Sequence, residues 1–165
     1  MTTPGCTRFA ARRNALAGVF ASLMLAASGA HAVLGGNESS IAADRMRLKA
    51  AGRMTAMSTP TSIRIHEMSL SDGSSVREYV DATGVVFAVA WSTRLKPRLK
   101  PLLGDHALRY EAAAGAIAAK AGIRRNVTVE SHDLVVHSAA HLNSYVGVAY
   151  LRSLVPAGIN ADALR

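Results

Sequence analysis

Hydrophobic and polar residues alternate most regularly over residues 76–91, "VREYVDATGVVFAVAW", where two apolar runs flank the turn sequence "DATG". Alternation with a period of two is typical of β-strands. An earlier run at residues 62–70, "SIRIHEMSL", joins the first of these through "SDGS". The pattern therefore predicts three strands joined by short turns, which is an antiparallel meander.

The register of the first hairpin can be argued from charge. A two-residue loop would place Glu67 opposite Glu78, and two like charges on facing positions are unfavourable by roughly 0.2–1 kcal/mol. A three-residue loop ending at Gly73 instead places Glu67 opposite Arg77 and His66 opposite Glu78. It also puts the glycine at the left-handed position of that loop. We therefore favour the three-residue loop.

Two further features of the meander follow from its apolar phase. After Ile65 the apolar residues move from odd-numbered to even-numbered positions, which predicts a bulge near His66 and Glu67. In the third strand, one face is expected to carry Val85, Phe87, Val89 and Trp91. The other is expected to carry Val86, Ala88 and Ala90. The face with the large side chains has enough volume to form a core, and the face with the small side chains would let a helix approach closely.

The second half of the chain predicts a helix followed by three strands. Apolar residues recur at helical spacing from residue 99, and Pro101 and Gly104 divide the helix into a short turn and a longer part. The longer part is expected to begin at Asp105 as N-cap and to end at Gly122. "NVTVES", "DLVVHS" and "SYVGVAYL" read as strands, with turns at 131–133 and 141–143. The fold class is therefore α+β, an antiparallel sheet of about six strands with one main helix on one face.

The N-terminus predicts export. Three arginines precede an uncharged run at 15–27, and "SGAHA" places Ala30 and Ala32 at an A-x-A cleavage site. Together these indicate a helical signal peptide over 1–32, cleaved after Ala32. A membrane anchor is the competing hypothesis, but the run spans only about 20 Å as a helix against roughly 30 Å of hydrocarbon. Twin-arginine export is a weaker alternative to the general route.

The rest of the chain divides into two parts. Residues 33–61 are expected to form a weakly ordered helix and linker, with Asn37 or Ser39 as a possible N-cap. Residues 62–165 are expected to form a single α+β domain. No stable membrane span is expected after cleavage, so localisation is predicted as periplasmic or extracellular.

Composition narrows the chemistry. Cys6, the only cysteine, lies in the leader, so the exported part has no disulfide, thiolate nucleophile or cysteine metal ligand. All 11 acidic residues but only 16 of the 19 Lys and Arg lie after residue 32, which lowers the net charge from +8 to +5. This mild excess of positive charge favours binding to anionic surfaces. In an exported protein it does not indicate nucleic-acid binding. No cofactor is predicted, and the expected partner is an envelope component or an anionic surface.

Three histidines offer the best-looking catalytic pattern. His132, His137 and His141 include an i, i+4 pair, the spacing that puts two imidazoles on one helical face toward zinc. However, "DLVVHS" is short and β-branched, so His137 is expected on a strand, where that spacing does not apply. A metal-dependent hydrolase therefore stays as the alternative function, and no catalytic residue is assigned.

The candidate binding residues lie around the meander. Arg94, Lys96, Arg98 and Lys100 follow Trp91 in "RLKPRLK", a run suited to lipid head groups, anionic polysaccharide or an acidic partner. Solvated loop charge is the competing interpretation. The hairpin adds Arg77, Glu78 and Tyr79. The favoured function is an exported, non-enzymatic binding or envelope-accessory domain, and a secreted surface or matrix protein held by charge is a further alternative.

Several segments carry a family resemblance. They are "VREYVD-x-x-G-x-VFAVAW", then "LKPLLG", then "LVVHS…YVGVAYLRSLVPAG", which together span about residues 63–158. Here the chain resembles a family of small exported proteins of Gram-negative bacteria that is catalogued only as a domain of unknown function. The resemblance implies export, one domain and the meander, and it supplies no catalytic residues.

Overall fold

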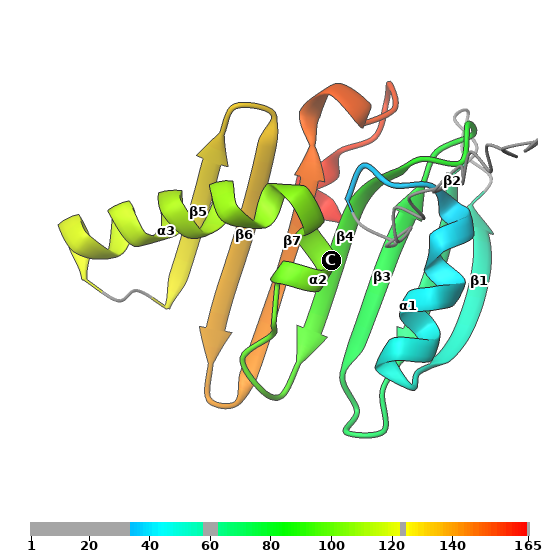
Figure 1. Ribbon diagram of the computed structural model, residues 1–165, viewed down its shortest axis with the longest axis horizontal. Helices are drawn as coiled ribbons and strands as arrows, with labels where there is room; N and C mark the ends of the chain where they lie inside the picture. Colours follow the sequence, from blue (N-terminus) through cyan, green and yellow to red (C-terminus); the bar gives the residue numbers. More distant parts are fainter. Residues whose placement is uncertain (1–33, 58–62, 123–124, 165) are drawn as a thin grey trace, which may run out of the picture.

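The computed structural model describes residues 34–57, 63–122 and 125–164, which form an α+β fold around one open antiparallel sheet (Figure 1). Its seven strands follow the order β1-β2-β3-β4-β7-β6-β5. In chain order they are β1 (Ala51–Met57), β2 (Ile63–Ser69), β3 (Ser75–Val80), β4 (Val86–Thr93), β5 (Asn126–Ser131), β6 (Leu134–His141) and β7 (Ser144–Leu151). The predicted fold class is confirmed, with one strand more than expected.

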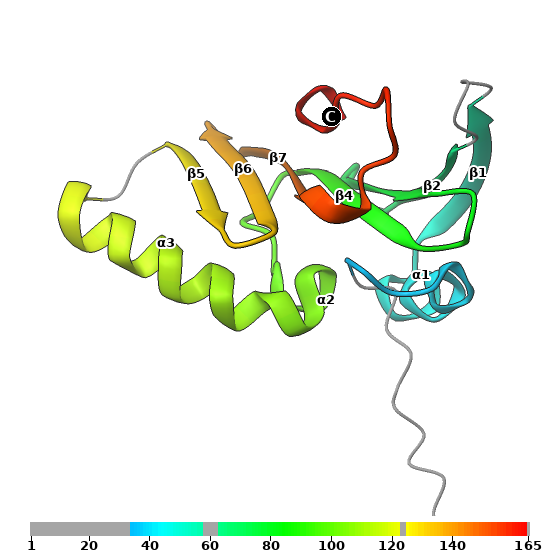
Figure 2. The ribbon, with the colours of Figure 1, turned by 90° about the horizontal axis from the view of Figure 1, so that it is seen from above.

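The helices all lie on one face of the sheet, and the C-terminal segment crosses the other (Figure 2). The helices are α1 (Ile41–Leu48), α2 (Lys100–Leu103) and α3 (Ala107–Ala121). We call the sheet face beneath them the helix face. The opposite face, against which residues 152–164 pack, is the tail face. Each face has its own cluster of buried apolar side chains.

The helical region between β4 and β5 divides where it was predicted to. Pro101 stands in the first turn of α2, and a 3-10 turn at Gly104–His106 joins α2 to α3. Gly122 has φ 72° and ends α3. The predicted N-cap, Asp105, is wrong, because it lies inside the 3-10 turn and His106 occupies the cap position without a side-chain bond.

The β2–β3 hairpin has the predicted register. Glu67 faces Arg77, and His66 faces Glu78. The Leu70 N–H donates to the Ser74 carbonyl at 2.8 Å, which closes a three-residue loop, and Gly73 has φ 81°. Turn chemistry and cross-strand charge pairing therefore set this register.

The bulge predicted near His66 and Glu67 is wrong, since β2 pairs with β3 without interruption. The alternation of apolar residues breaks there because His66, which is polar, lies on the helix face, while Ile63 and Ile65 pack on the tail face. The bulge lies in β4 instead. Val86 pairs with Val80 and the next ladder pair skips one residue, Phe87.

This bulge changes which side chains of β4 share a face. Phe87 and Ala88 both pack on the tail face, and beyond them Val89 and Trp91 return to the helix face. The predicted alternation through Phe87 is therefore wrong. The helices also cover the side of Val89 and Trp91, and both alanines of β4, Ala88 and Ala90, belong to the tail-face cluster.

Residues 38–57 are mostly helical turn, helix and strand, where the pattern predicted a weakly ordered helix and a linker. Asn37 caps a 3-10 turn by accepting a bond from the Ser39 N–H at 2.9 Å, and α1 follows. Residues 51–57 were assigned to a linker but form β1, which pairs with β2 along its whole length. The sequence "AGRMTAM" does not predict this edge strand, because β-branched apolar residues do not alternate with polar residues along it. The predicted signal peptide with Ala30 and Ala32, and the linker at 58–62, lie outside the described residues.

Candidate functional site

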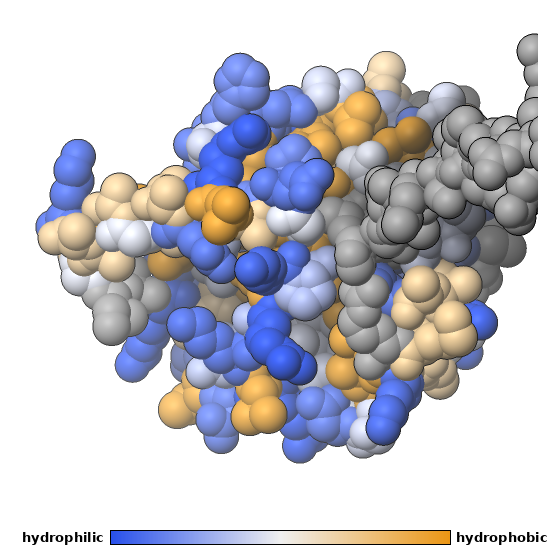
Figure 3. Space-filling model, viewed as in Figure 1, coloured by the Kyte–Doolittle hydropathy of each residue, from blue (hydrophilic) through white to orange (hydrophobic). Residues whose placement is uncertain are grey.

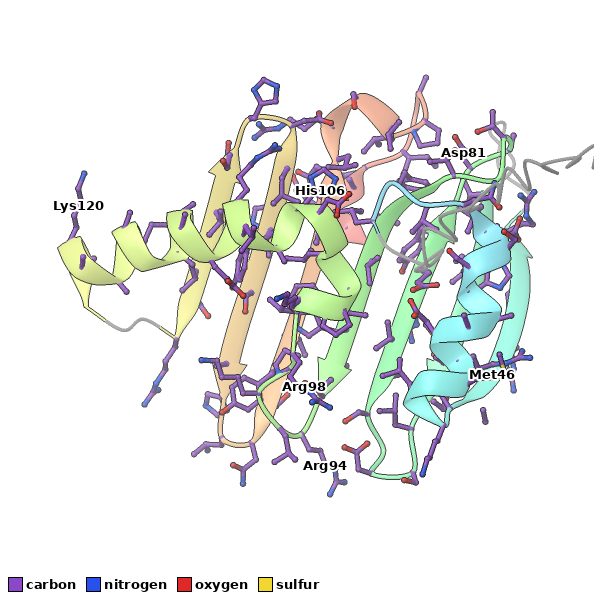
Figure 4. The ribbon with its side chains drawn as sticks, in the orientation of Figure 1. Met46, Asp81, Arg94, Arg98, His106 and Lys120 are labelled. Atoms are coloured by element: carbon purple, nitrogen blue, oxygen red, sulfur yellow. The ribbon has the colours of Figure 1, made fainter. Side chains whose placement is uncertain are left out.

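The basic run lies on an exposed segment that connects the end of β4 to α2. We call Arg94, Lys96, Arg98 and Lys100 the basic segment, and all four side chains are exposed. Figure 3 shows hydrophilic side chains gathered on this side of the molecule, and Figure 4 places Arg94 and Arg98 along the segment. Within the described residues, none of the four forms an ion pair.

A hollow beside this segment runs between α3 and the sheet. It has a volume of about 490 Å³, which lies within the range of roughly 300–1,000 Å³ that is typical of small-molecule sites. We call it the α3 groove. Its apolar wall includes Leu99, Ala114, Ile117, Val127 and Ala140. Its polar lining includes Lys96, Tyr110, Arg125, Ser138 and Tyr145.

The groove exists because α3 is built from small residues. The "EAAAGAIAAK" stretch keeps the helix slender above β5, and Ile117 is the large apolar residue that fills part of the gap. Tyr110 is half-buried, and burial raises the pKa of its phenol above the ordinary value. A second hollow of about 560 Å³ shares Lys96, Leu99 and Tyr110 with the groove and adds Arg98 and Lys100. The two hollows therefore adjoin each other.

The chemistry of this space combines an apolar interior with cations at its edge. Arg125, like the basic segment, forms no ion pair within the described ranges. Glu111 is the one carboxylate among the described residues that line the two hollows. An apolar pocket edged with unneutralised cations favours a ligand that has an apolar body and an anionic head.

Trp91 does not belong to this site, because it is a core residue and only 3% exposed. Its indole lies over Gly147 of β7, where an added Cβ would stand 2.3 Å from Trp91 Cζ2. Tyr79 is also buried, on the tail face, with its ring centroid 6.2 Å from that of Phe87. Arg77 Nε donates to Glu67 Oε1 at 3.1 Å on the same face. The fold therefore separates the hairpin candidates from the basic segment.

Glu78, a candidate binding residue of the hairpin, is not available to a ligand at the surface, since it is fully buried beneath α1. Burial, and then the nearby Asp44 carboxylate, raises the pKa of Glu78 to about 8. Neither carboxyl oxygen has a hydrogen-bond partner within the described residues. Next to it, Glu38 Oε1 lies 2.6 Å from His66 Nε2, and Arg64 donates to both Glu38 oxygens. The Glu38 carboxylate, in the 3-10 turn that leads into α1, thus ties this region to the sheet. The helix covers Glu78, whose raised pKa favours the protonated carboxyl at neutral pH.

The three histidines of the alternative hypothesis are not brought together. His132 lies in the β5–β6 turn with φ 57°, His137 in the middle of β6, and His141 at its end. A strand rises about 3.3 Å per residue, so His137 and His141 lie roughly 13 Å apart along β6. The described residues contain no group of three His, Cys, Asp or Glu side chains that could hold a metal ion.

His137 takes part in a different arrangement, which the sequence did not reveal. Its Nδ1 lies 3.1 Å from Thr128 Oγ1, and its Nε2 lies 3.1 Å from Asp162 Oδ1. The Tyr150 hydroxyl donates to the same Asp162 oxygen at 2.7 Å. Thr128 is simply the cross-strand neighbour of His137. The arrangement therefore fastens the C-terminal segment to the tail face.

The residues that sequence reasoning missed are those that come together only in the fold. Arg125 reaches the α3 groove from just before β5, Tyr145 from β7 and Tyr110 from α3. They are separated in the chain and share no motif. The one usable signal was the alanine-rich helix, which predicts a close but incompletely filled contact with a sheet.

Comparisons with known proteins identify the family without adding a function. The family model "Protein of unknown function (DUF2844)" matches residues 30–164, so the chain belongs to that family. No curated protein and no solved structure matches the chain significantly. Among the described residues, no helix is long and apolar enough to cross a membrane.

Proposed function

We propose that this member of the DUF2844 family is an exported, non-enzymatic binding domain of the cell envelope. Its ligand is a single-chain amphiphile with an anionic head, and its site is the α3 groove. The observation that carries the proposal is the apolar hollow of about 490 Å³ with Lys96 and Arg125 in its lining. Neither cation has an ion-pair partner within the described chain, so an anionic head would supply one.

The energetics favour an amphiphile over a free small anion. An exposed ion pair contributes only about 0–1 kcal/mol, so cations at an open groove hold a free anion weakly. Each buried methylene adds about 0.8 kcal/mol, because it leaves water for an apolar wall. An alkyl chain between Ile117 and Val127 would therefore supply most of the affinity, and the head group would orient the chain.

Export is the second part of the proposal. The leader pattern over residues 1–32 supports it, and the remaining 133 residues contain no cysteine that an oxidising compartment would oxidise. Mass spectrometry of the protein recovered from fractionated cells tests this directly. The expected species begins at Val33 in the periplasmic or extracellular fraction, and a cytosolic species that retains residues 1–32 overturns it.

The ligand is tested by calorimetry on the protein as the cell processes it from the full-length gene. The probes are decyl phosphate and decyltrimethylammonium, each below its micelle concentration. We expect the anionic probe to bind more tightly than the cationic one, with the affinity rising about four-fold for each added methylene in a series of alkyl phosphates. Equal binding of both probes, or of neither, overturns the proposal.

Charge removal identifies the site. Lys96→Ala and Arg125→Ala are each expected to weaken decyl phosphate binding by up to about five-fold, because each removes an ion pair at the open groove that is worth at most about 1 kcal/mol. Lys120→Ala is the matched control. It removes the same charge from the same face, but Lys120 lies at the far end of α3 and points away from the sheet (Figure 4). An equal loss in all three variants would mean that net charge, and not the groove, binds the probe.

A metal-dependent hydrolase and a charge-held matrix protein are the competing functions. The first needs His132, His137 and His141 at one ion, and the fold spreads them along a strand and its two turns. Elemental analysis of the purified protein separates it from the binding domain, since it requires stoichiometric zinc. The second predicts binding to envelope fractions that disappears in high salt and does not depend on alkyl chain length.

A further inference from the structure

One end of the sheet brings three loops together. The β2–β3 turn, the start of the segment after β4 and the β6–β7 turn meet there, and they line a shared hollow of about 420 Å³ through Gly73, Arg94 and Leu142 (Figure 1). Thr93 Oγ1 donates to the Leu95 carbonyl at 2.8 Å and also contacts the Tyr145 carbonyl at 3.4 Å. These bonds hold the segment after β4 against the start of β7.

Two leucines project from this end into solvent. Leu95 is 74% exposed and Leu142 is 87% exposed. Single exposed apolar residues are ordinary on a protein surface, but these two stand on adjoining loops. Met46 and Leu108, the other strongly exposed large apolar residues in the described ranges, lie on α1 and α3 and not on these loops.

Leu142 is also strained. Leu142 and Asn143 form the two-residue turn between β6 and β7, with φ 36° and 61°. Positive φ suits glycine, asparagine and aspartate, whereas the Cβ and branched side chain of leucine disfavour it. The chain thus places an apolar residue where a polar one would be more stable, and the residue buries almost nothing. A strained residue without an internal contact points to an external one.

Cations flank Leu95, and one of them, Arg94, lines the same hollow as Leu142. Arg94 and Lys96 flank Leu95 directly, and Arg98 follows on the same segment. Asp72 on the β2–β3 turn opposes them; its carboxylate accepts a bond from the Ser74 N–H at 2.8 Å and lies within the field of Arg94. Three cations against one carboxylate leave this end positive.

We propose that this end of the sheet docks on an anionic lipid bilayer. Leu95 and Leu142 enter the boundary between head groups and acyl chains, while Arg94, Lys96 and Arg98 contact the anionic head groups. Apolar tips ringed by basic side chains suit this interface, since the two contributions add. Docking also places the α3 groove, which shares Lys96 with this end, beside the lipid from which its ligand would come.

Docking is tested by sedimentation with lipid vesicles, using the processed full-length protein. The vesicles are phosphatidylcholine alone and an equal mixture of phosphatidylcholine and phosphatidylglycerol. We expect binding to the mixture only, weakened by high salt because the head-group contacts are screened. Equal binding to both vesicles, or to neither, overturns the proposal.

The double variant Leu95→Ser/Leu142→Asn removes the apolar tips. We expect its vesicle affinity to fall at least ten-fold, which corresponds to about 1.4 kcal/mol. Asparagine tolerates positive φ, so the variant is expected to fold at least as well as the wild type. Met46→Ser/Leu108→Ser is the matched control, with two equally exposed apolar residues removed elsewhere. If both double variants bind vesicles like the wild type, or lose binding equally, the leucine end is not the docking surface.

The same variants separate this inference from the proposed function. If Leu95→Ser/Leu142→Asn loses vesicles but still binds decyl phosphate, docking and the groove are distinct and both stand. If the wild type binds vesicles but not decyl phosphate, docking stands and the proposed ligand fails. If it binds decyl phosphate but not the mixed vesicles, the groove stands and docking fails.

Discussion

The buried carboxyl of Glu78 makes the stability of this protein depend on pH in a direction opposite to that of most carboxylates. Its side chain is fully buried beneath α1, has no hydrogen-bond partner within the described residues, and lies near the Asp44 carboxylate. The perturbation that isolates this effect is Glu78→Gln, which keeps the size of the side chain and removes its titration.

The magnitude follows from two pKa values. The pKa of Glu78 is about 8 in the folded protein, against an ordinary value of 4.5. Between these values the unfolded chain releases a proton that the folded chain keeps, so the free energy of unfolding falls as the pH rises. At about 1.4 kcal/mol per pH unit, the loss is about 3 kcal/mol by pH 7 and about 5 kcal/mol by pH 8. Below 4.5 both states are protonated and the loss disappears.

The assay is urea unfolding of the wild type and of Glu78→Gln over a pH series that brackets the two pKa values. We expect the variant to gain stability relative to the wild type as the pH rises, by up to about 5 kcal/mol across the series, because the amide has no proton to release. A buried amide without a partner costs about 1–3 kcal/mol, but this offset is the same at every pH. The slope of the difference is therefore the readout.

Glu67→Gln is the matched control, since it makes the same chemical change on the adjacent strand at a side chain that is 33% exposed. The reasoning is refuted if the curves for the wild type and Glu78→Gln run parallel. It is also refuted if the difference grows toward acid, since that would mean a Glu78 carboxylate stabilised in its charged form.

Three further changes have expected outcomes. Gly147→Ala should lower the free energy of unfolding by roughly 3 kcal/mol, because the new Cβ would stand 2.3 Å from Trp91 Cζ2 and 2.4 Å from the His137 carbonyl oxygen; a melting curve like that of the wild type would show that both the indole and the β6 backbone can shift. Leu142→Gly should raise stability by up to about 1 kcal/mol in chemical unfolding, because it relieves a φ of 36°, and a loss would place Leu142 in an unrecognised internal contact. Asp162→Ala should speed limited proteolysis of the C-terminal segment and bring the pKa of Tyr150 down from about 12, as measured by ultraviolet titration; an unchanged titration would mean that burial alone raises it.

Local chemistry predicted a good part of this fold. The register that pairs Glu67 with Arg77 follows from one glycine and one unfavourable charge pair, both within a hairpin of a few residues. The division of the helix at Gly104 and its end at Gly122 are equally local. These features were predictable because φ preferences and cross-strand neighbours act over short stretches of chain.

Other features were out of reach because they depend on what lies across the sheet. The β4 bulge at Phe87 changes which side chains of β4 face the helices and which face the C-terminal segment. β1 is a strand only because it pairs with the edge of β2. Glu78 was a candidate binding residue beside Arg77, and it is buried because α1 packs over that part of the sheet.

The amino-acid sequence by itself determined six of the seven strands, the hairpin turns, the α+β class and the positive excess of the basic segment. Only the tertiary structure decided that Lys96, Tyr110 and Arg125 line one groove, that Leu95 and Leu142 share one end, and that His132, His137 and His141 stay apart. The physical reason is the range of the interactions. Strand alternation and turns are encoded by neighbouring residues, whereas a site is assembled by burial, which depends on which element covers which face.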